Sequence, residues 1–253
     1  MHENMITKEY SFNKLSALGI EGIIFDYGAT LDTCGNHWGQ VIWHAYQFAD
    51  VPVSENDYRA AYVHVERTLA INKIIMPDFT FDAVLSTKLQ MQLAYLRDNK
   101  VLDVLQLELD IMHDVMLTYL ARNLKRTLDH SRFVLEQLRK RYPLVLVSNF
   151  YGNINAVLKE FGLDELFMGV IESAVVGYRK PALRLFSLGV EALGLKPEEV
   201  VMVGDSFYKD ILPAQRVGCQ TVWLKGEGWN KESYDERVPD RVITSLDQLL
   251  PSE

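Results

Sequence analysis

The chain has 253 residues, of which 48% are hydrophobic, and a formal net charge of −8. This length and composition fit a globular protein with a large hydrophobic core. The acidic balance argues against nucleic acid or an anionic membrane as the main partner, because both require a basic surface, whereas a few local cations can still hold a small anionic substrate.

The sequence also gives expectations about the cellular setting. Residues 1–14 contain no apolar core of signal-peptide length, and no uninterrupted apolar run approaches the roughly 18 residues of a membrane span. Cys34 and Cys219 are the only cysteines, and neither lies in a metal-ligand cluster or a disulfide framework. We therefore expect a soluble, cytoplasmic protein with reduced cysteines and no membrane partner.

A short apolar segment at residues 20–25 predicts a buried strand. Asp26 follows this segment directly, and Gly28 lies in the turn-forming sequence after it. Ligands bind at the carboxyl ends of the strands in an open parallel sheet, so a carboxylate at this position is a candidate for chemistry. An aspartate after a strand is also a common turn former or helix N-cap, so the position alone leaves both interpretations open.

Residues 35–127 are dominated by apolar residues at helical spacing, which predicts an all-helical insert. The expected helices are 38–49, 54–74, 80–97 and 101–124. The aromatic and methionine residues of the insert are interpreted as its packed interior rather than a cofactor pocket. Four histidines without ligand-like spacing are interpreted as ordinary residues: His37, His44, His64 and His113.

From about Ser131 the pattern changes to alternating helices and strands, which indicates a parallel sheet covered by helices on both faces. Further strands are expected at 143–147, 170–171, 200–203, 219–224 and 242–243. A helix is expected to begin near Ser131, before the first of these strands. The chain is thus predicted to have an α/β core, residues 1–34 and 128–253, that the helical segment 35–127 interrupts.

Polar side chains follow several predicted strands or lie in the loops between them. They are Asp26, Ser148 with Asn149, Lys180, and Asp205 with Asp210. Because strand ends converge in such a sheet, we expect these side chains to lie together. A hydroxyl and an amide can hydrogen-bond a phosphoryl oxygen, a lysine can neutralise it, and two aspartates can hold Mg²⁺. Each residue alone has a structural alternative, such as a cap or a solvated charge, but the combination indicates phosphoryl transfer.

These residues resemble the four motifs of the haloacid dehalogenase superfamily, across essentially the whole chain. The first motif, D-x-D-x-T after an apolar strand, resembles Asp26 to Thr30, and the second, a serine or threonine after a strand, resembles Ser148. The third resembles Lys180 in Arg-Lys-Pro, and the specific fourth motif, GDSxxxD, resembles Gly204 to Asp210. The resemblance implies a Rossmann-like, doubly wound parallel sheet with a helical cap inserted after the first motif.

The resemblance also implies roles for individual residues. Asp26 would be the nucleophile that forms an aspartyl phosphate, and Ser148 and Lys180 would hold the phosphate. Asp26 and Asp205 would bind Mg²⁺, and Asp210 would support the metal site. The implied activity is hydrolysis of a small phosphorylated metabolite beneath a cap that excludes water.

Gly28 departs from the family pattern. Phosphatases of the family carry a second aspartate at this position, which serves as general acid and general base. Glycine can do neither, and such proton transfer contributes about 10² to 10⁴ in rate, so we expect slow turnover unless another group substitutes. The backbone carbonyl through which this position binds the metal in the family is retained. A positive φ at Gly28 would make an aspartate there costly.

Three alternatives stay open at this point. Phosphonoacetaldehyde hydrolases of the family have a small residue at position 28 and use a cap lysine for a Schiff base. Lys73 and Lys88 lie in the insert, but the sequence around them matches no such lysine, and a solvated charge is the simpler interpretation. The 2-haloacid dehalogenases need no metal, which fits the acidic fourth motif poorly. A phosphate-binding or regulatory protein that has lost hydrolysis would also lack the second aspartate.

Overall fold

The computed structural model describes residues 19–230 and 233–251, so the expectation about a signal peptide concerns residues outside this range. Within it, one sheet has the order β3-β2-β1-β4-β5-β6, and every pairing is parallel. The strands are β1 (Gly22–Phe25), β2 (Leu144–Ser148), β3 (Gly169–Glu172), β4 (Val200–Gly204), β5 (Gln220–Leu224) and β6 (Arg241–Ile243). The strand order reverses between β1 and β4, which is where an open α/β sheet binds ligands.

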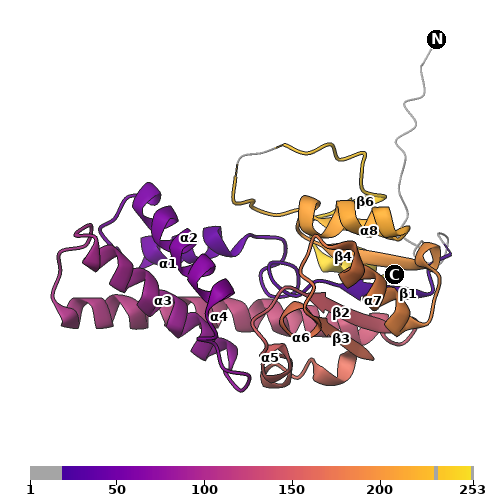
Figure 1. Cartoon of the computed structure of the whole chain (residues 1–253), viewed down its shortest axis with the longest axis horizontal. Helices are drawn as coiled ribbons and strands as arrows, with labels where there is room; N and C mark the ends of the chain where they lie inside the picture. Colours follow the sequence, from indigo (N-terminus) through magenta and orange to yellow (C-terminus); the bar gives the residue numbers. More distant parts are fainter. Residues whose placement is uncertain (1–18, 231–232, 252–253) are drawn as a thin grey trace, which may run out of the picture.

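Helices cover both faces of the sheet, as the predicted α/β class requires (Figure 1). They are α1 (Trp38–Phe48), α2 (Glu55–Ile71), α3 (Phe81–Asp98), α4 (Gln106–Leu138), α5 (Ile154–Glu160), α6 (Ser173–Val176), α7 (Leu183–Leu193) and α8 (Leu212–Val217). Short 3₁₀ and π turns are η2 (Asp164–Leu166), η3 (Pro197–Glu199), η4 (Phe207–Ile211) and η5 (Leu246–Leu249). No helix in the described ranges is long and apolar enough to cross a lipid bilayer.

Adjacent residues of β1 pack against opposite layers. Ile23 and Phe25 share a core cluster with Leu135 of α4, whereas Ile24 packs in a second cluster with Phe186 of α7. Successive side chains of a strand point to opposite faces, so a strand covered on both faces must be apolar throughout. The predicted doubly wound parallel sheet is confirmed.

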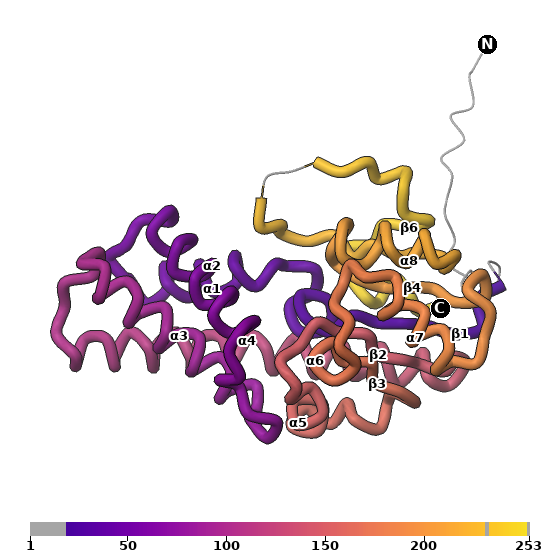
Figure 2. Tube along the Cα trace, in the orientation of Figure 1, coloured from indigo at the N-terminus to yellow at the C-terminus, as the bar shows by residue number. Residues whose placement is uncertain are grey.

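The insert between β1 and β2 forms a helical lobe beside the sheet, which we call the cap (Figure 2). It comprises α1, α2, α3 and the N-terminal part of α4, with extensive packing between α2 and α3 and between α3 and α4. Ser54 caps α2 by accepting a hydrogen bond from the backbone of Asp57, as its spacing in the sequence predicts. Thr80 caps α3 in the same way through Ala83.

One long helix, α4, replaces the two helices expected on either side of residues 125–130. It runs without interruption for 33 residues from the cap to the core. Leu124, Leu128 and Ser131 are all buried, so the spacing that faces the interior continues through the expected break. The segment also contains no glycine or proline that would end a helix. The predicted core boundary at residue 128 lies inside α4.

Candidate active site

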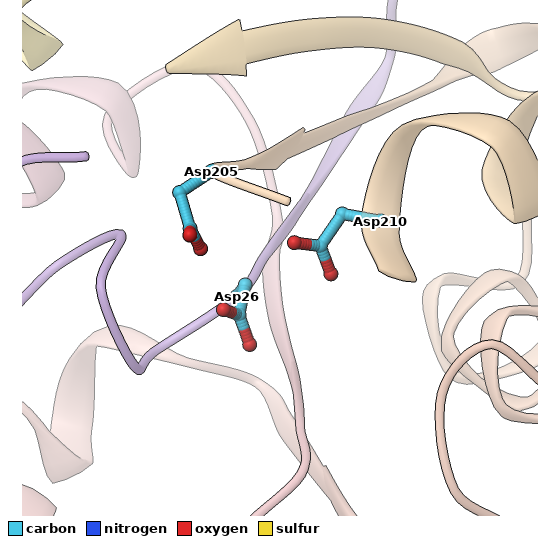
Figure 3. A group of neighbouring side chains, drawn as sticks. All are labelled: Asp26, Asp205 and Asp210. Carbon is cyan, nitrogen blue, oxygen red and sulfur yellow. The ribbon is translucent and has the colours of Figure 1, made fainter. Parts of the chain in front are cut away.

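Three carboxylates gather where β1 and β4 end. Asp26 follows β1 directly, Asp205 follows β4 directly, and Asp210 lies in the turn η4. Each offers one carboxylate oxygen, and these oxygens all lie within 4.8 Å of one another (Figure 3). Clustered carboxylate oxygens suit a hard divalent cation such as Mg²⁺, so the residues present fit a metal site.

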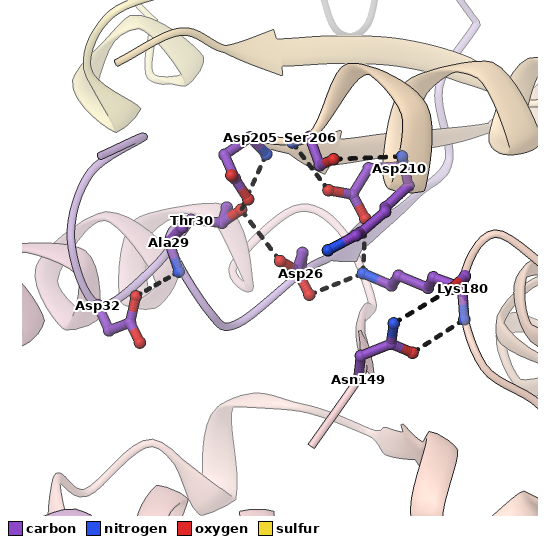
Figure 4. A network of polar contacts seen from close by, with 10 residues as sticks. Asp26, Ala29, Thr30, Asp32, Asn149, Lys180, Asp205, Ser206 and Asp210 are labelled. Atoms are coloured by element: carbon purple, nitrogen blue, oxygen red, sulfur yellow. Dashed lines mark hydrogen bonds and ion pairs between the residues drawn. The ribbon is translucent and has the colours of Figure 1, made fainter. Parts of the chain in front are cut away.

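Lys180 lies among these carboxylates (Figure 4). Its Nζ atom is 2.7 Å from Oδ1 of Asp26 and 2.7 Å from Oδ1 of Asp210. Asn149 holds the loop that carries it: the amide oxygen of Asn149 accepts from the backbone N–H of Lys180 at 2.9 Å, and its Nδ2 donates to the Lys180 carbonyl at 3.3 Å. The side chain of Asn149 therefore positions Lys180, and its predicted contact with phosphate stays a prediction.

Thr30 links the loops after β1 and β4. Its Oγ1 accepts from the backbone N–H of Asp205 at 3.0 Å, and the same atom lies 3.1 Å from Oδ1 of Asp205 and 3.4 Å from Oδ2 of Asp26. A hydroxyl has a single proton, so the shorter carboxylate contact is the better hydrogen bond. Asp210 is oriented separately, because the backbone N–H of Ser206 donates to its Oδ2 at 3.0 Å.

Burial controls the charges of this cluster. Removal from water raises the pKa of Asp26 to about 6, against the opposing effect of Lys180. Burial and the charge of Asp210 raise the pKa of Asp205 well above its usual value. Burial disfavours the charged form of Lys180, but Asp210 and Asp26 outweigh it and raise the pKa of Lys180. One lysine thus leaves the three carboxylates short of positive charge, which a divalent cation would supply.

A cavity of about 180 Å³ lies between this cluster and the cap. All the site residues predicted from sequence line it: Asp26, Gly28, Ser148, Asn149, Lys180, Asp205 and Asp210. Ser148 is buried at the end of β2. The structure therefore brings the predicted residues together, while their individual roles stay predictions.

Gly28 faces open space in this cavity. A Cβ atom added there would meet no described atom within 4 Å, and Gly28 does not adopt a positive φ. The positive φ of this turn belongs instead to Ala29, at 67°, whose backbone N–H donates to Asp32 at 2.6 Å. The backbone at Gly28 is therefore not strained, and the turn can accept a side chain at that position.

The cap contributes an ion pair between a buried lysine and a partly exposed glutamate, which the sequence analysis does not predict. Lys88 of α3 lies with its Nζ 2.7 Å from Oε1 of Glu66 on α2, and Lys88 is only 8% exposed. Tyr151, in the loop after β2, donates to Oε2 of Glu66 at 2.9 Å. The interpretation of Lys88 as a solvated charge is wrong, whereas Lys73 is exposed. No local pattern marks Lys88, because its burial depends on how α2 packs against α3.

Two further residues that line the cavity, His37 and Tyr62, have no site role in the sequence analysis. His37 lines the cavity, and its Nδ1 accepts from the backbone of Gly39 to cap α1. Burial lowers the pKa of His37 to about 4, so the imidazole is neutral at pH 7. Tyr62 also lines the cavity. The aromatic and methionine residues of the cap are expected in its packed interior. Tyr58 is buried, as expected, but the expectation is wrong for Met76, which is 50% exposed.

Comparison with known proteins identifies the family. A model of the haloacid dehalogenase-like hydrolases matches residues 20–218, which include the whole acidic cluster. The chain belongs to the haloacid dehalogenase-like hydrolases. The resemblance seen in the sequence motifs is thereby confirmed, and the protein is an enzyme of a hydrolase family.

Curated relatives agree with this assignment, and a solved structure shares the fold. The glyceraldehyde 3-phosphate phosphatase of Pyrococcus furiosus is 42% identical over 89 residues, 35% of this chain and 37% of that protein. The phosphoserine phosphatase of Thermus thermophilus is 34% identical over 122 residues, 48% of each protein. The chain thus matches less than half the length of either relative. The HAD-hydrolase YfnB from Bacillus subtilis has the same fold at 19% identity and a TM-score of 0.53, over 91% of this chain and 96% of that one.

Proposed function

We propose that this chain is a Mg²⁺-dependent phosphatase that hydrolyses the phosphate monoester of a small metabolite. The observation that carries the proposal is the contact of Lys180 with both Asp26 and Asp210 on the floor of a capped cavity. This arrangement combines a carboxylate nucleophile with cationic charge where a phosphoryl group would lie. The names of the two phosphatase relatives support a phosphate monoester as substrate.

Asp26 is the proposed nucleophile. Its carboxylate oxygen attacks the phosphorus, the bond between phosphorus and the leaving-group oxygen breaks, and an aspartyl phosphate forms. Water then attacks the aspartyl phosphate, which releases inorganic phosphate and regenerates the carboxylate. Lys180 orients Asp26 and offsets the charge of the phosphoryl oxygens, and the hydroxyl of Ser148 donates to one of them.

The residues that would hold Mg²⁺ are Asp26, Asp205 and Asp210, together with the backbone carbonyl of Gly28. When bound, Mg²⁺ would stabilise the negative charge that develops on the phosphoryl oxygens. Thr30 and Ser206 hold Asp205 and Asp210 in place for this task, through the hydrogen bonds described above.

Gly28 leaves the reaction without the carboxylate that would protonate the leaving group. We therefore propose turnover that is slow on esters with poor leaving groups, by a factor on the scale of general acid catalysis, about 10² to 10⁴. The same glycine is the observation that favours a second candidate function, a phosphate-ligand binding protein that no longer hydrolyses. Binding and turnover are separable measurements, so one set of assays can distinguish the two.

The state of Lys88 argues against the Schiff-base alternative. Lys88 is the only buried lysine among the described residues of the cap. A Schiff base requires a neutral amine. Burial opposes the charge on Lys88, but the contact with Glu66 and the neighbouring tyrosines outweigh it and raise the pKa of Lys88. Lys88 is therefore held as an ammonium ion. The alternative of a 2-haloacid dehalogenase is not favoured either. Such an enzyme needs no metal, whereas three carboxylates that cluster together suit a metal site.

The test is a panel of sugar phosphates, nucleotides, phosphonates and p-nitrophenyl phosphate, assayed with Mg²⁺ and with EDTA. We expect hydrolysis that needs Mg²⁺ and is lost in Asp26→Asn. Asp129→Asn is the matched control, because Asp129 is half-exposed on α4, where it pairs with Lys125 and does not line the cavity. Tight binding of phosphate or vanadate without any Asp26-dependent turnover would select the binding protein instead.

A further inference from the structure

The ion pair of Lys88 and Glu66 faces the same cavity as Asp26. Lys88, Glu66 and Tyr151 all line that cavity, and they come from α3, α2 and the loop after β2. Tyr151 follows Asn149 by two residues, so it connects the ion pair of the cap to the loop that follows Ser148. An ion pair that is largely removed from water contributes little net stability, because desolvation offsets most of the attraction. Its position at a ligand cavity therefore points to recognition rather than to stabilisation of the cap.

The pair offers both donors and acceptors to a ligand. The ammonium of Lys88 has three N–H donors, and its ion-pair contact with Glu66 engages one side of it. The carboxylate of Glu66 accepts from Tyr151 through Oε2, yet each carboxylate oxygen has a second lone pair. A hydroxyl group donates and accepts at once, so it can bind both residues without separating them.

Counted at their formal charges, the acidic and basic residues around the cavity cancel. The acidic residues that line it are Asp26, Glu66, Asp205 and Asp210, and the basic ones are Lys88, Arg179, Lys180 and Lys209. His37 adds no charge at neutral pH. A divalent cation and a phosphate dianion also cancel, so the rest of the substrate meets a cavity without net charge. An anionic leaving group would give the occupied cavity a net negative charge.

We propose that Glu66 and Lys88 bind the hydroxyl groups of a small, uncharged polyhydroxy leaving group, such as the glycerol or short-sugar part of a phosphate monoester. This inference rests on the proposed phosphatase function and adds its substrate class. The cavity volume of about 180 Å³ suits a small leaving group. Tyr62 and Leu85 supply apolar wall beside the pair, which suits the carbon skeleton of such a compound.

A zwitterionic leaving group fits less well, although it also has no net charge. The charges of Glu66 and Lys88 already satisfy each other at 2.7 Å. An amino acid would have to insert its own ammonium and carboxylate against this pair, and both ions would lose their hydration. Hydroxyl groups keep the pair intact and lose less hydration energy, so the geometry favours them over phosphoserine-type substrates.

The first experiment compares four phosphate esters on the wild-type protein with Mg²⁺. Glycerol 3-phosphate has an uncharged hydroxylated leaving group, phosphoserine a zwitterionic one, 3-phosphoglycerate an anionic one, and ethyl phosphate lacks further hydroxyls. We expect kcat/KM for glycerol 3-phosphate to exceed that for each of the others by about 10- to 100-fold, the scale of hydrogen bonds to charged groups. Equal or higher kcat/KM for phosphoserine, 3-phosphoglycerate or ethyl phosphate overturns the inference.

The second experiment removes the pair as a unit, in the double variant Glu66→Gln/Lys88→Met, so that neither charge is left buried alone. The preference for glycerol 3-phosphate over ethyl phosphate should fall by about 10- to 100-fold, mainly through KM. Tyr151→Phe is a milder variant that keeps both charges and should reduce the preference in the same direction. Lys125→Met, at an exposed ion pair of α4, is the control and should leave the preference unchanged.

A binding measurement keeps the inference separate from catalysis. Calorimetry on Asp26→Asn should show weaker binding of glycerol 3-phosphate once the double substitution is added, with little change for ethyl phosphate. An equal loss for both esters would mean that the pair only supports the cap, which overturns the inference. Failure of the proposed function looks different, because p-nitrophenyl phosphate would then show no Asp26-dependent hydrolysis in any variant.

Discussion

The backbone of Gly204 lies so close to Asp210 that a Cβ atom at position 204 would be 2.6 Å from both Cβ and Cγ of the aspartate. The glycine of the fourth motif is therefore required by space, because a side chain there would displace a carboxylate of the acidic cluster. This contact links the end of β4 to the turn η4 and sets where Asp210 can lie.

Gly204→Ala should weaken Mg²⁺ binding and lower kcat/KM by at least about tenfold, since the methyl group must push Asp210 out of the cluster. Calorimetric titration with Mg²⁺ and steady-state kinetics measure the two effects. Gly169→Ala is a matched control at the start of β3, where an added Cβ would make ordinary contacts of 3.6 Å with Ala192 and Val145. Equal behaviour of the two variants would contradict this role of Gly204.

Lys180→Met should destabilise the Mg²⁺-free protein by about 3–5 kcal/mol at pH 8, because it leaves Asp26 and Asp210 buried without their cation. The loss should be smaller at pH 5, where Asp26, with a pKa of about 6, is largely protonated. Urea unfolding of the variant and of wild type at both pH values measures the loss of stability. Lys125→Met removes an exposed pair and should cost less than about 1 kcal/mol at either pH.

Asp32 should make the stability of the Mg²⁺-free protein fall as pH rises from 4 to 8. Burial raises its pKa from 3.8 to about 7, although Trp38 and the backbone of Ala29 donate hydrogen bonds to it. In this window the unfolded chain loses the Asp32 proton before the folded protein does, so rising pH favours unfolding. Below pH 4 the contribution of Asp32 is fully present, and above pH 8 it is lost.

Asp32→Asn removes this titration. Its free energy of unfolding, measured in EDTA relative to that of wild type, should increase by up to about 4 kcal/mol between pH 4 and pH 8, which means that the variant gains relative stability. The variant should still be less stable than wild type at pH 4, because an asparagine cannot accept from both Trp38 and Ala29. Parallel stability curves for the two proteins across this range would show that Asp32 has an ordinary pKa.

Gly28→Asp should fold normally, because the position has an ordinary φ and open space for a side chain. If the missing carboxylate limits turnover, hydrolysis of an alkyl phosphate should increase by up to about 10² to 10⁴, and hydrolysis of p-nitrophenyl phosphate by less, since its leaving group needs no proton. Gly28→Asn adds a side chain of the same size without an acid. A gain no larger than that of Gly28→Asn would rule out proton transfer as the limiting step.

The local pattern of residues determined the sheet and the acidic cluster. Residues 20–25, 143–147 and 200–203 are short, mainly apolar segments that predict buried strands, and Asp26 and Asp205 follow two of them. Parallel strands place their carboxyl ends on one edge of the sheet, so strand order and chain direction suffice to bring these residues together. This is why the predicted site residues line one cavity.

Tertiary packing decided what the local pattern leaves undetermined. The helix α4 continues through residues 125–130 because the cap and the core bury the same face of it. The sequence pattern, taken segment by segment, predicts two helices there instead of one. Glu66 and Lys88 lie 22 positions apart in the sequence, on helices whose mutual packing no local spacing encodes, yet together they form one wall of the cavity. Helical periodicity shows which face of a helix is buried, but the partner of that face depends on contacts between distant segments, and so does substrate choice.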